Sequence, residues 1–160
     1  VLGICGGYQM LGRRIGAPEG LDGAPGTVEG LGLLDVETVM EPTKALTRVR
    51  ARHAATGAGF DGYEIHVGRT RGADCARPFA HVGTMPDGAV SADGRIAGTY
   101  LHGLFADDGF RSAWLAARGA AVSAVAFGTR VEAALDGLAA HLEAALDLDA
   151  LFAAAEEVGP

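Results

Sequence analysis

The stretch Val1-Leu2-Gly3-Ile4-Cys5-Gly6-Gly7-Tyr8-Gln9 decides the fold of this chain. Its first four residues form a short apolar run, which is typical of a strand buried in a parallel sheet. Glycines on both sides of Cys5 allow a tight turn, and apolar residues at helical spacing continue to Ile15, before Gly16 and Pro18. The pattern predicts a strand, a sharp turn and a helix, with the side chain of Cys5 at the carboxyl end of the strand.

The rest of the chain mixes strand and helix patterns. Alternating or apolar runs predict further strands over residues 33–39, 46–52, 63–70, 89–92 and 96–101. Helices are predicted from a cap at Asp107 or Asp108 to Gly119, and over residues 131–146, while the glycine-rich residues 19–32 predict a loop. We expect an α/β fold whose sheet is mostly parallel and flanked by helices, with an antiparallel extension from the middle strands.

Composition limits the function further. The chain has 160 residues, 49% of them hydrophobic, which is enough for one domain with a full core. Its net charge of −7 argues against a nucleic-acid or membrane-surface partner, and no apolar run is long enough to span a bilayer. With only two cysteines, Cys5 and Cys75, we expect no disulfide and a cytoplasmic setting. Because Val1 lies directly before the first strand, we expect N-terminal strands to be missing, so that residues 1–160 are a truncated domain.

Cys5 has the surroundings of a nucleophile. The tight turn strains its backbone and exposes its thiol, and the following helix start favours the thiolate. The N–H of Gly6 is free to stabilise an oxyanion. A thiolate mechanism also needs a base, and of the five histidines His102 fits best, because it ends a predicted strand and is followed by Gly103. We interpret His53, His81 and His141 as structural, and the arginines at 48, 50 and 52 as a solvated strand face.

The motifs resemble a known family. Residues 3–9 resemble the G-x-C-x-G-x-Q nucleophile segment of class I glutamine amidotransferases, and Gly98-Thr99-Tyr100-Leu101-His102-Gly103 resembles their histidine segment. Within that class, residues 62–70, 91–95, 102–111 and 138–149 are similar to the cobyric acid synthase family. The resemblance runs from Val1 to about Phe152 and implies a flavodoxin-like domain.

The resemblance also implies roles. Cys5 would attack the side-chain amide of glutamine and form a glutamyl thioester, with His102 moving protons and Gly6 donating to the oxyanion. Gln9 matches the family residue that holds the amino-acid end of glutamine, and His66 lies in another part of the glutamine pocket. No metal site is expected.

One position departs from the wider class. Most class I amidotransferases have a glutamate two residues after the histidine, where this chain has Leu104. The cobyric acid synthase family shares this difference, which predicts weak or partner-dependent glutaminase activity. Glu64, Asp107 or a backbone carbonyl could orient His102 instead, and the sequence does not choose among them.

The resemblance places the rest of the chemistry elsewhere. The chain has no G-x-x-x-x-G-K-[ST] motif, so we expect it to bind no cofactor itself. ATP and Mg²⁺ are expected in a separate synthetase domain, which would amidate carboxylates of adenosylcobyrinic acid a,c-diamide with ammonia from this domain. Alternatives are an amidotransferase subunit that acts on lipid II with a Mur-ligase-like partner, a non-catalytic domain of the same fold, or a peptide-directed cysteine hydrolase. Ile65, where the lipid II enzymes are expected to have asparagine, and Gln9 argue against the first and the last.

Overall fold

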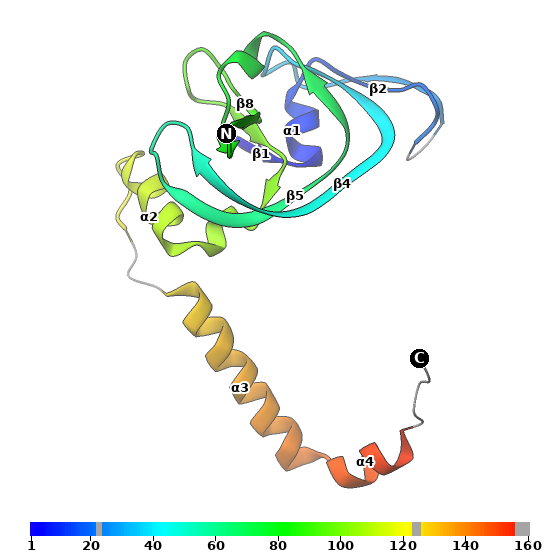
Figure 1. The fold of residues 1–160 in the computed structure, drawn as a ribbon, viewed down its shortest axis with the longest axis vertical. Helices are drawn as coiled ribbons and strands as arrows, with labels where there is room; N and C mark the ends of the chain where they lie inside the picture. The colour runs from blue at the N-terminus through cyan, green and yellow to red at the C-terminus, as the bar shows by residue number, and fades with distance from the viewer. Residues whose placement is uncertain (22–23, 123–125, 156–160) are drawn as a thin grey trace. The chain divides into compact units, whose positions relative to one another are not determined.

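The computed structural model describes residues 1–21, 24–122 and 126–155, without the side chains of residues 43 and 44. The chain divides into two units, Val1–Ser123 and Ala124–Pro160. Among the described residues, the first unit holds every strand and the second holds the helices α3 and α4 (Figure 1). Each unit is described by itself.

A small sheet carries the nucleophile. Strand β1 (Leu2–Ile4) pairs in parallel with β9 (Ala97–Thr99), which also pairs with β8 (Ala89–Val90) in the antiparallel direction. Helix α1 (Gly6–Leu11) follows β1 after Cys5. A Cβ at Gly98 would lie 1.9 Å from Cδ2 of Tyr8, so glycine is needed for α1 to pack directly on β9.

A larger sheet forms around one long hairpin. Strands β4 (Glu37–His53) and β5 (Gly59–Arg71) pair antiparallel, and Figure 1 shows this hairpin curving around β1 and α1. The other strands of this sheet are β2 (Arg14–Ala17), β3 (Gly26–Glu29), β6 (Ala80–Val82), β7 (Met85–Asp87) and β10 (Leu101–His102). Strand β10 pairs with β5, β2 pairs with β4 in parallel and with β3, and β6 pairs with β4 and β7.

The α/β class is confirmed, and the predicted antiparallel extension is the larger part of the structure. In the described residues only β1–β9 and β2–β4 pair in parallel. The reason is the length of the β4–β5 hairpin, which turns back over residues 54–58 and so must pair antiparallel. The parallel pair β1–β9 lies where the sequence predicts it, directly before Cys5.

Four local expectations are wrong. The single strand expected over 96–101 is broken at Tyr100 into β9 and β10, which lie in different sheets. The first helix ends at Leu11, and Ile15 lies in β2, because residues 14–17 find backbone partners in β3 and β4. The loop expected over 19–32 contains strand β3, while residues 22 and 23 lie outside the described part. Strand β4 begins at Glu37 rather than at residue 33, because the N–H groups of Leu33 and Leu34 both donate to the carbonyl of Leu11.

Two clusters of buried side chains form the core of the first unit. The aromatic core comprises Ala51, Phe60, Phe79, Ala80, Ala97, Leu101, Leu104, Phe110 and Trp114. The tyrosine core comprises Tyr8, Leu11, Leu34, Val36, Ala89 and Tyr100. Trp114 is therefore a core residue, as its helical spacing predicts.

Helix α2 (Asp108–Ala116) supplies part of the aromatic core. The carboxylate of Asp107 accepts a hydrogen bond from the N–H of Phe110 at 2.8 Å, which confirms a cap at this position. Two short 3₁₀ helices, η1 (Ala73–Ala76) and η2 (Leu104–Ala106), complete the unit. They connect β5 to β6 and β10 to α2.

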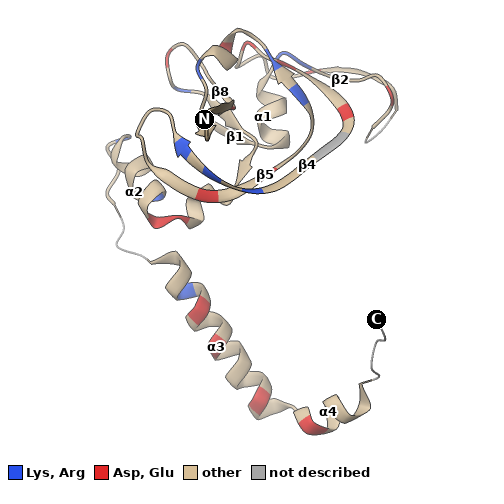
Figure 2. Cartoon of the chain, viewed as in Figure 1, with Lys and Arg blue, Asp and Glu red and all other residues tan. Residues whose placement is uncertain are grey.

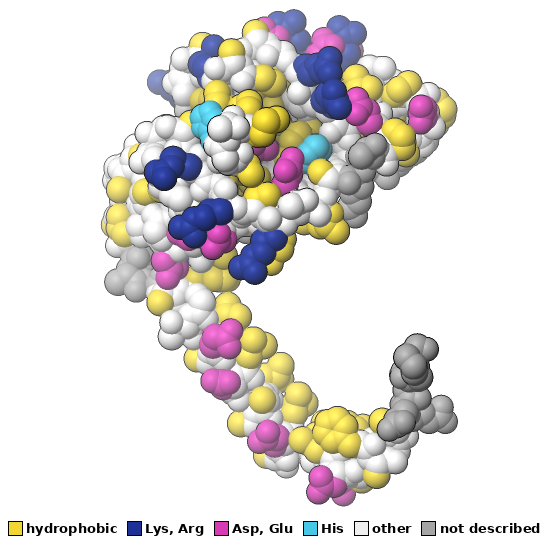
Figure 3. All heavy atoms as spheres, viewed as in Figure 1, with side chains coloured by type: hydrophobic (Ala, Val, Ile, Leu, Met, Phe, Trp, Pro, Cys, Tyr) yellow, Lys and Arg dark blue, Asp and Glu magenta, His cyan; other side chains and the backbone are white. Residues whose placement is uncertain are grey.

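The second unit is helical. It contains α3 (Phe127–Ala145) and α4 (Leu148–Ala154), and α3 confirms the predicted amphipathic helix. Figure 3 shows apolar side chains along the helices of this unit. The exposed apolar residues on one stripe of α3 and directly after it are Val131, Leu135, Leu138, Leu142 and Leu146. None of the helices in the described part of the chain is long and apolar enough to cross a membrane.

The arginine row follows one face of β4. The side chains of Arg48, Arg50 and Arg52 are exposed, as expected, and Figure 2 shows basic residues along the hairpin. Arg50 forms an ion pair with Asp61 at 3.7 Å. Such exposed pairs contribute little to stability, so this row is a solvated face of the sheet in the structure.

Candidate active site

The backbone of Cys5 adopts a conformation that side chains rarely accept. Its φ is 54° and its ψ is −118°, and no other non-glycine residue in the described ranges has a positive φ. The N–H of Cys5 donates to the carbonyl of Thr99 at 2.9 Å, and the carbonyl of Cys5 accepts from the N–H of Gln9. The parallel pair and the first turn of α1 together hold this strained residue, as the sequence predicts for a nucleophile at a sharp turn.

One carbonyl oxygen lies between the thiol and the imidazole. The Sγ of Cys5 lies 3.4 Å from the oxygen of Ile65, and the Nε2 of His102 lies 3.2 Å from the same oxygen. A carbonyl can only accept hydrogen bonds, so both the thiol and Nε2–H donate to it. Cys5 and His102 therefore share an acceptor that β5 supplies, although they lie on different sheets.

The structure shows which of the three candidate groups contacts His102. Of the three candidates, Glu64 contacts His66 and Asp107 caps α2, so the contact on His102 comes from a backbone carbonyl. Leu104, at the position of the missing glutamate, is 1% exposed and belongs to the aromatic core.

Two hydrogen bonds hold the side chain of Gln9. Its Nε2 donates to the carbonyl of Val67 at 3.0 Å and to the hydroxyl of Tyr100 at 3.3 Å. The hydroxyls of Tyr100, Thr70 and Thr38 continue this chain of hydrogen bonds, with oxygen–oxygen distances of 2.5 and 2.7 Å. Burial raises the pKa of Tyr100, which keeps its hydroxyl protonated and able to donate.

The ring of His66 lies beside the same tyrosine. It stacks on Tyr100 with ring centroids 4.1 Å apart, its Nδ1 donates to the carbonyl of Gly68 at 2.9 Å, and its Nε2 lies 3.2 Å from Glu64. His66, Tyr100 and Glu64 line a hollow of about 490 Å³ together with Asp87, and Cys5 is not among its lining residues. The side chain of His66 thus contacts Tyr100, Glu64 and Gly68, and its link to Gln9 passes through Tyr100.

Sequence reasoning missed the buried polar residues that surround the site. The site predicted from the sequence does not include Tyr100, Thr70 or Asp87. Tyr100 and Thr70 share a hydrogen bond next to Gln9, and Asp87 accepts one from Thr99, the partner of Cys5. A usable signal for Tyr100 was its place two residues before His102, where strand alternation puts its side chain on the same side. Asp87 carried no such signal, because its partners are 12 and 13 residues away.

The remaining histidines belong to other elements of the chain. His53 is 5% exposed among aromatic rings, and its Nδ1 lies 2.8 Å from the hydroxyl of Thr56. Burial, and then the charge of Arg118, lower its pKa to about 4. His81 lies in β6 and His141 is exposed on α3. Within the described residues, no group of three or more His, Cys, Asp or Glu side chains is arranged to hold a metal ion.

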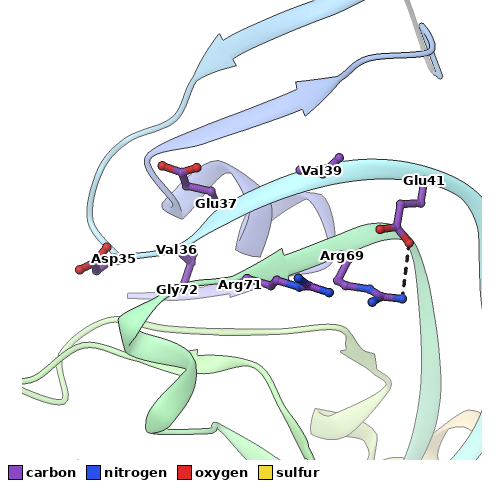
Figure 4. Close-up of a pocket in the computed structure, with 8 residues that line it drawn as sticks. All are labelled: Asp35, Val36, Glu37, Val39, Glu41, Arg69, Arg71 and Gly72. Carbon is purple, nitrogen blue, oxygen red and sulfur yellow. Dashed lines mark ion pairs between the residues drawn. The ribbon is translucent and has the colours of Figure 1, made fainter.

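A second hollow, of about 470 Å³, is lined by β4 and the end of β5 (Figure 4). Its lining carries the carboxylates of Asp35, Glu37 and Glu41 and the guanidinium groups of Arg69 and Arg71. Figure 4 shows the two arginines side by side, with Arg69 paired to Glu41 at 3.7 Å. The other two carboxylates are also paired, Asp35 with Arg13 at 3.1 Å and Glu37 with Arg14 at 3.0 Å.

The fold and the site define a class. A cysteine in a strained strand-to-helix turn that shares a hydrogen-bond acceptor with an imidazole is typical of cysteine-dependent amide hydrolases. The family model for the CobB/CobQ-like glutamine amidotransferase domain matches residues 1–110. This chain belongs to that family.

Curated relatives give the same picture. The chain is 63% identical over 155 residues to a cobyric acid synthase of Cereibacter sphaeroides, 64% identical over 155 residues to one of Paracoccus denitrificans, and 56% identical over 160 residues to one of Hyphomonas neptunium. These matches cover 97%, 97% and 99% of this chain and 32% of each relative. The chain therefore spans about a third of the length of the relatives it matches.

Proposed function

We propose that this chain is the glutaminase part of a cobyric acid synthase, releasing ammonia from glutamine with Cys5 as nucleophile and His102 as general base and acid. The observation that carries the proposal is the shared carbonyl of Ile65, which brings the thiol and the imidazole to one point. The conformation of Cys5 supports it as well, because strain of this kind collects at functional sites.

The chemistry follows from the residues. The thiolate of Cys5 attacks the side-chain amide carbon of glutamine, and the N–H of Gly6 stabilises the oxyanion that forms. The carbon–nitrogen bond then breaks as His102 gives a proton to the leaving ammonia, which leaves a glutamyl thioester. His102 next takes a proton from water, the water attacks the thioester, and glutamate leaves as the carbon–sulfur bond breaks. Gln9 would hold the amino-acid end of the substrate.

The carbonyl of Ile65 is the acceptor for His102 before glutamine enters the site. While Nε2–H donates to this oxygen, Nε2 has no lone pair with which to take the proton of the thiol. Catalysis therefore requires that the imidazole leave the carbonyl and meet Cys5 directly. The glutamine amide, which has both donors and acceptors, can replace His102 and Cys5 on the oxygen of Ile65 as it enters.

The wider role rests on the relatives, which are named as cobyric acid synthases. We propose that the ammonia amidates carboxylates of adenosylcobyrinic acid a,c-diamide in cobalamin biosynthesis, in the cytoplasm. Activating a carboxylate requires ATP and Mg²⁺, and we assign both to a synthetase domain outside these 160 residues. We propose no metal or cofactor for this chain itself.

The test is glutamate release from glutamine by this chain and by a form extended to the length of its relatives. Each is compared with its own Cys5→Ala variant, and Cys75→Ala is the matched control for loss of a thiol. We expect activity in the extended form that Cys5→Ala abolishes and Cys75→Ala leaves within about twofold. An extended form that makes no glutamate in the presence of ATP, Mg²⁺ and the corrinoid would favour a non-catalytic domain.

A further inference from the structure

The two halves of the site meet at one break in the chain. Strand β9 ends at Thr99, whose carbonyl accepts from the N–H of Cys5 at 2.9 Å. Strand β10 begins at Leu101 on the other sheet, where His102 pairs with Tyr63 of β5. The distance between nucleophile and base thus depends on how the chain turns over residues 99–101.

A single carboxylate holds that turn. Asp87 accepts a hydrogen bond from the hydroxyl of Thr99 and a longer one, at 3.4 Å, from the N–H of Tyr100. The hydroxyl of Thr99 in turn accepts from the N–H of Leu101 at 3.1 Å. The side chain of Asp87 therefore fixes two backbone N–H groups, that of Tyr100 directly and that of Leu101 through Thr99.

We propose that Asp87 is a positioning residue for the glutaminase reaction, which holds the backbone of His102 within reach of Cys5 by fixing the bend between β9 and β10. The proposal rests on the proposed function. Asp87 does not touch the thiol or the imidazole, so its effect passes through Thr99 and Tyr100. An error of about 1 Å in such a distance is enough to lower a rate by about 100-fold.

Asp87 is itself held firmly. Its carbonyl accepts from the N–H of Phe79 in the aromatic core, and the next residue, Gly88, has a φ of 76°. A Cβ at Gly88 would lie 2.1 Å from the carbonyl oxygen of Gly98, so the turn packs directly against β9. The carboxylate therefore reaches the bend from a rigid support.

The environment of Asp87 is unfavourable for a charge. Burial raises its pKa to about 6, against the two hydrogen bonds and the more distant His66, which lower it, while Glu64 raises it further. The other titratable side chains that line the same hollow are Tyr8, Arg69, Cys75 and Tyr100. A carboxylate kept in such a place destabilises the fold at neutral pH, which is expected of a functional residue rather than of one selected for stability.

The chain offers a matched control. Asp93 also precedes a glycine at a turn, and its carboxylate also accepts from a hydroxyl, that of Ser91 at 2.6 Å, and from a backbone N–H, that of Arg95 at 3.1 Å. The two turns flank the same strand, β8. Asp93 is exposed and its partners do not lead to Cys5 or His102, so it reports the effect of losing such a carboxylate away from the site.

The experiment compares Asp87→Asn with Asp93→Asn in the extended form of the protein. Asparagine keeps the shape, but if its oxygen accepts from Tyr100, its NH₂ group faces the hydroxyl of Thr99 and no acceptor remains for that hydroxyl. For Asp87→Asn we expect kcat to fall about 10- to 100-fold, KM for glutamine to stay within about threefold and the melting temperature to stay equal or rise. For Asp93→Asn we expect kcat and KM within about twofold of the wild type.

A second pair of variants tests the same link from the other side. Thr99→Ser keeps the hydroxyl and Thr99→Val removes it, so only the valine variant should lower kcat. In the double variant with Asp87→Asn, Thr99→Val should lower kcat by a smaller factor than it does alone. The reason is that both substitutions break the same hydrogen bond between Thr99 and Asp87. If Asp87→Asn does not fold, this pair alone decides.

The alkylation of Cys5 by iodoacetamide separates the two possible failures. If the wild type makes no glutamate, the proposed function fails, and the alkylation rates of wild type and Asp87→Asn still compare the position of His102 beside the thiol. We expect slower alkylation of Cys5 in Asp87→Asn and an unchanged rate in Asp93→Asn. Equal kcat and equal alkylation in wild type and Asp87→Asn, or equal kcat in Thr99→Ser and Thr99→Val, would overturn the positioning role.

Discussion

The aromatic core and the tyrosine core hold the two ends of the site in different ways. In the aromatic core, rings pack on rings: Phe110 contacts Phe60, Phe79, Phe105 and Trp114, and its side chain is fully buried. Beside the tyrosine core, a chain of hydrogen bonds runs from Thr38 through Thr70 and the hydroxyl of Tyr100 to Gln9. Packing contacts are non-directional, whereas hydrogen bonds fix direction as well as distance.

The difference suggests a division of labour. The aromatic core supports the His102 end through Leu101 and Leu104, while the tyrosine core supports Gln9 and the turn of Cys5. Substitutions in the aromatic core should mainly lower the free energy of unfolding. Substitutions in the tyrosine core should mainly change kinetics. Each prediction below can break or sharpen this division.

The largest effect is expected for Leu104→Glu, which places the carboxylate of the wider class at its usual position. Leu104 is 1% exposed in the aromatic core, so we expect the free energy of unfolding to fall by about 4 kcal/mol at pH 7. Burial would raise the pKa of the new carboxyl above its unfolded value, so the loss should grow as pH rises from about 4 to 7. Urea unfolding, followed by the fluorescence of Trp114, the single tryptophan, measures it.

Leu104→Met is the matched control, because it keeps the volume and should change the free energy of unfolding by less than about 1.5 kcal/mol. A Leu104→Glu variant that is stable and more active than the wild type would place residue 104 in the site rather than in the aromatic core.

The second effect concerns His53, whose ring contacts Phe79, Phe110 and Trp114 of the aromatic core. Burial holds the pKa of His53 at about 4, so the unfolded chain binds more protons than the folded one between pH 4 and 6.5. The contribution of His53 to stability is therefore present above about pH 6.5 and lost as pH falls toward 4, by about 2 kcal/mol at pH 5. Asp87 acts in the opposite direction, because its raised pKa favours the folded state as pH falls below about 6.

His53→Phe keeps a ring and removes the titration. We expect the wild type to lose more stability than this variant between pH 7 and pH 5, measured by urea unfolding at each pH. His141→Asn, on the exposed helix α3, should show the pH dependence of the wild type. The same loss in His53→Phe as in the wild type would mean that the aromatic core does not exclude charge from His53.

The sequence predicts the nucleophile side well for a physical reason. Strand β1, the turn at Cys5 and helix α1 are consecutive in the chain, so their glycines and apolar residues record the local geometry directly. The same holds for the cap at Asp107 and for α3. In contrast, the segment around Ile15 reads as the end of a helix and becomes β2 (Arg14–Ala17), because partners 9 to 23 residues away decide its conformation.

The base side could be predicted only in part. The end of a predicted strand indicated His102, but its contact with the carbonyl of Ile65 depends on the pairing of β10 with β5, which no local pattern encodes. The roles of Tyr100 and Asp87 are hidden for the same reason. Buried hydrogen bonds between distant segments leave no periodic trace in a sequence.

The third effect belongs to the tyrosine core. Tyr100→Phe removes the hydroxyl that Gln9 and Thr70 share. Because Gln9 keeps its bond to Val67 and Thr70 keeps Thr38, we expect the free energy of unfolding to fall by only about 1.5 kcal/mol. KM for glutamine should rise about fivefold, because Gln9 loses one of the two contacts that orient it.

Tyr63→Phe is the control for loss of a hydroxyl, since Tyr63 lies on β5 and is 48% exposed. It should leave both quantities near the wild type. A Tyr100→Phe variant with unchanged KM and a large loss of stability would show that the tyrosine core is a packing core like its neighbour.

The smallest effect tests the strain at Cys5 itself. Glycine accepts a φ of 54° with a ψ of −118°, whereas alanine keeps the conflict between its Cβ and the backbone. Both Cys5→Gly and Cys5→Ala should abolish glutamate release, yet the glycine variant should be about 1 kcal/mol more stable in urea unfolding, because relief of strain exceeds the greater entropy of unfolded glycine. At Cys75, whose φ is not positive, the order should reverse, with Cys75→Ala more stable than Cys75→Gly. If the glycine variant is less stable than the alanine variant at both Cys5 and Cys75, the turn holds Cys5 without strain. The thiol is then exposed by the packing of α1 on β9 alone.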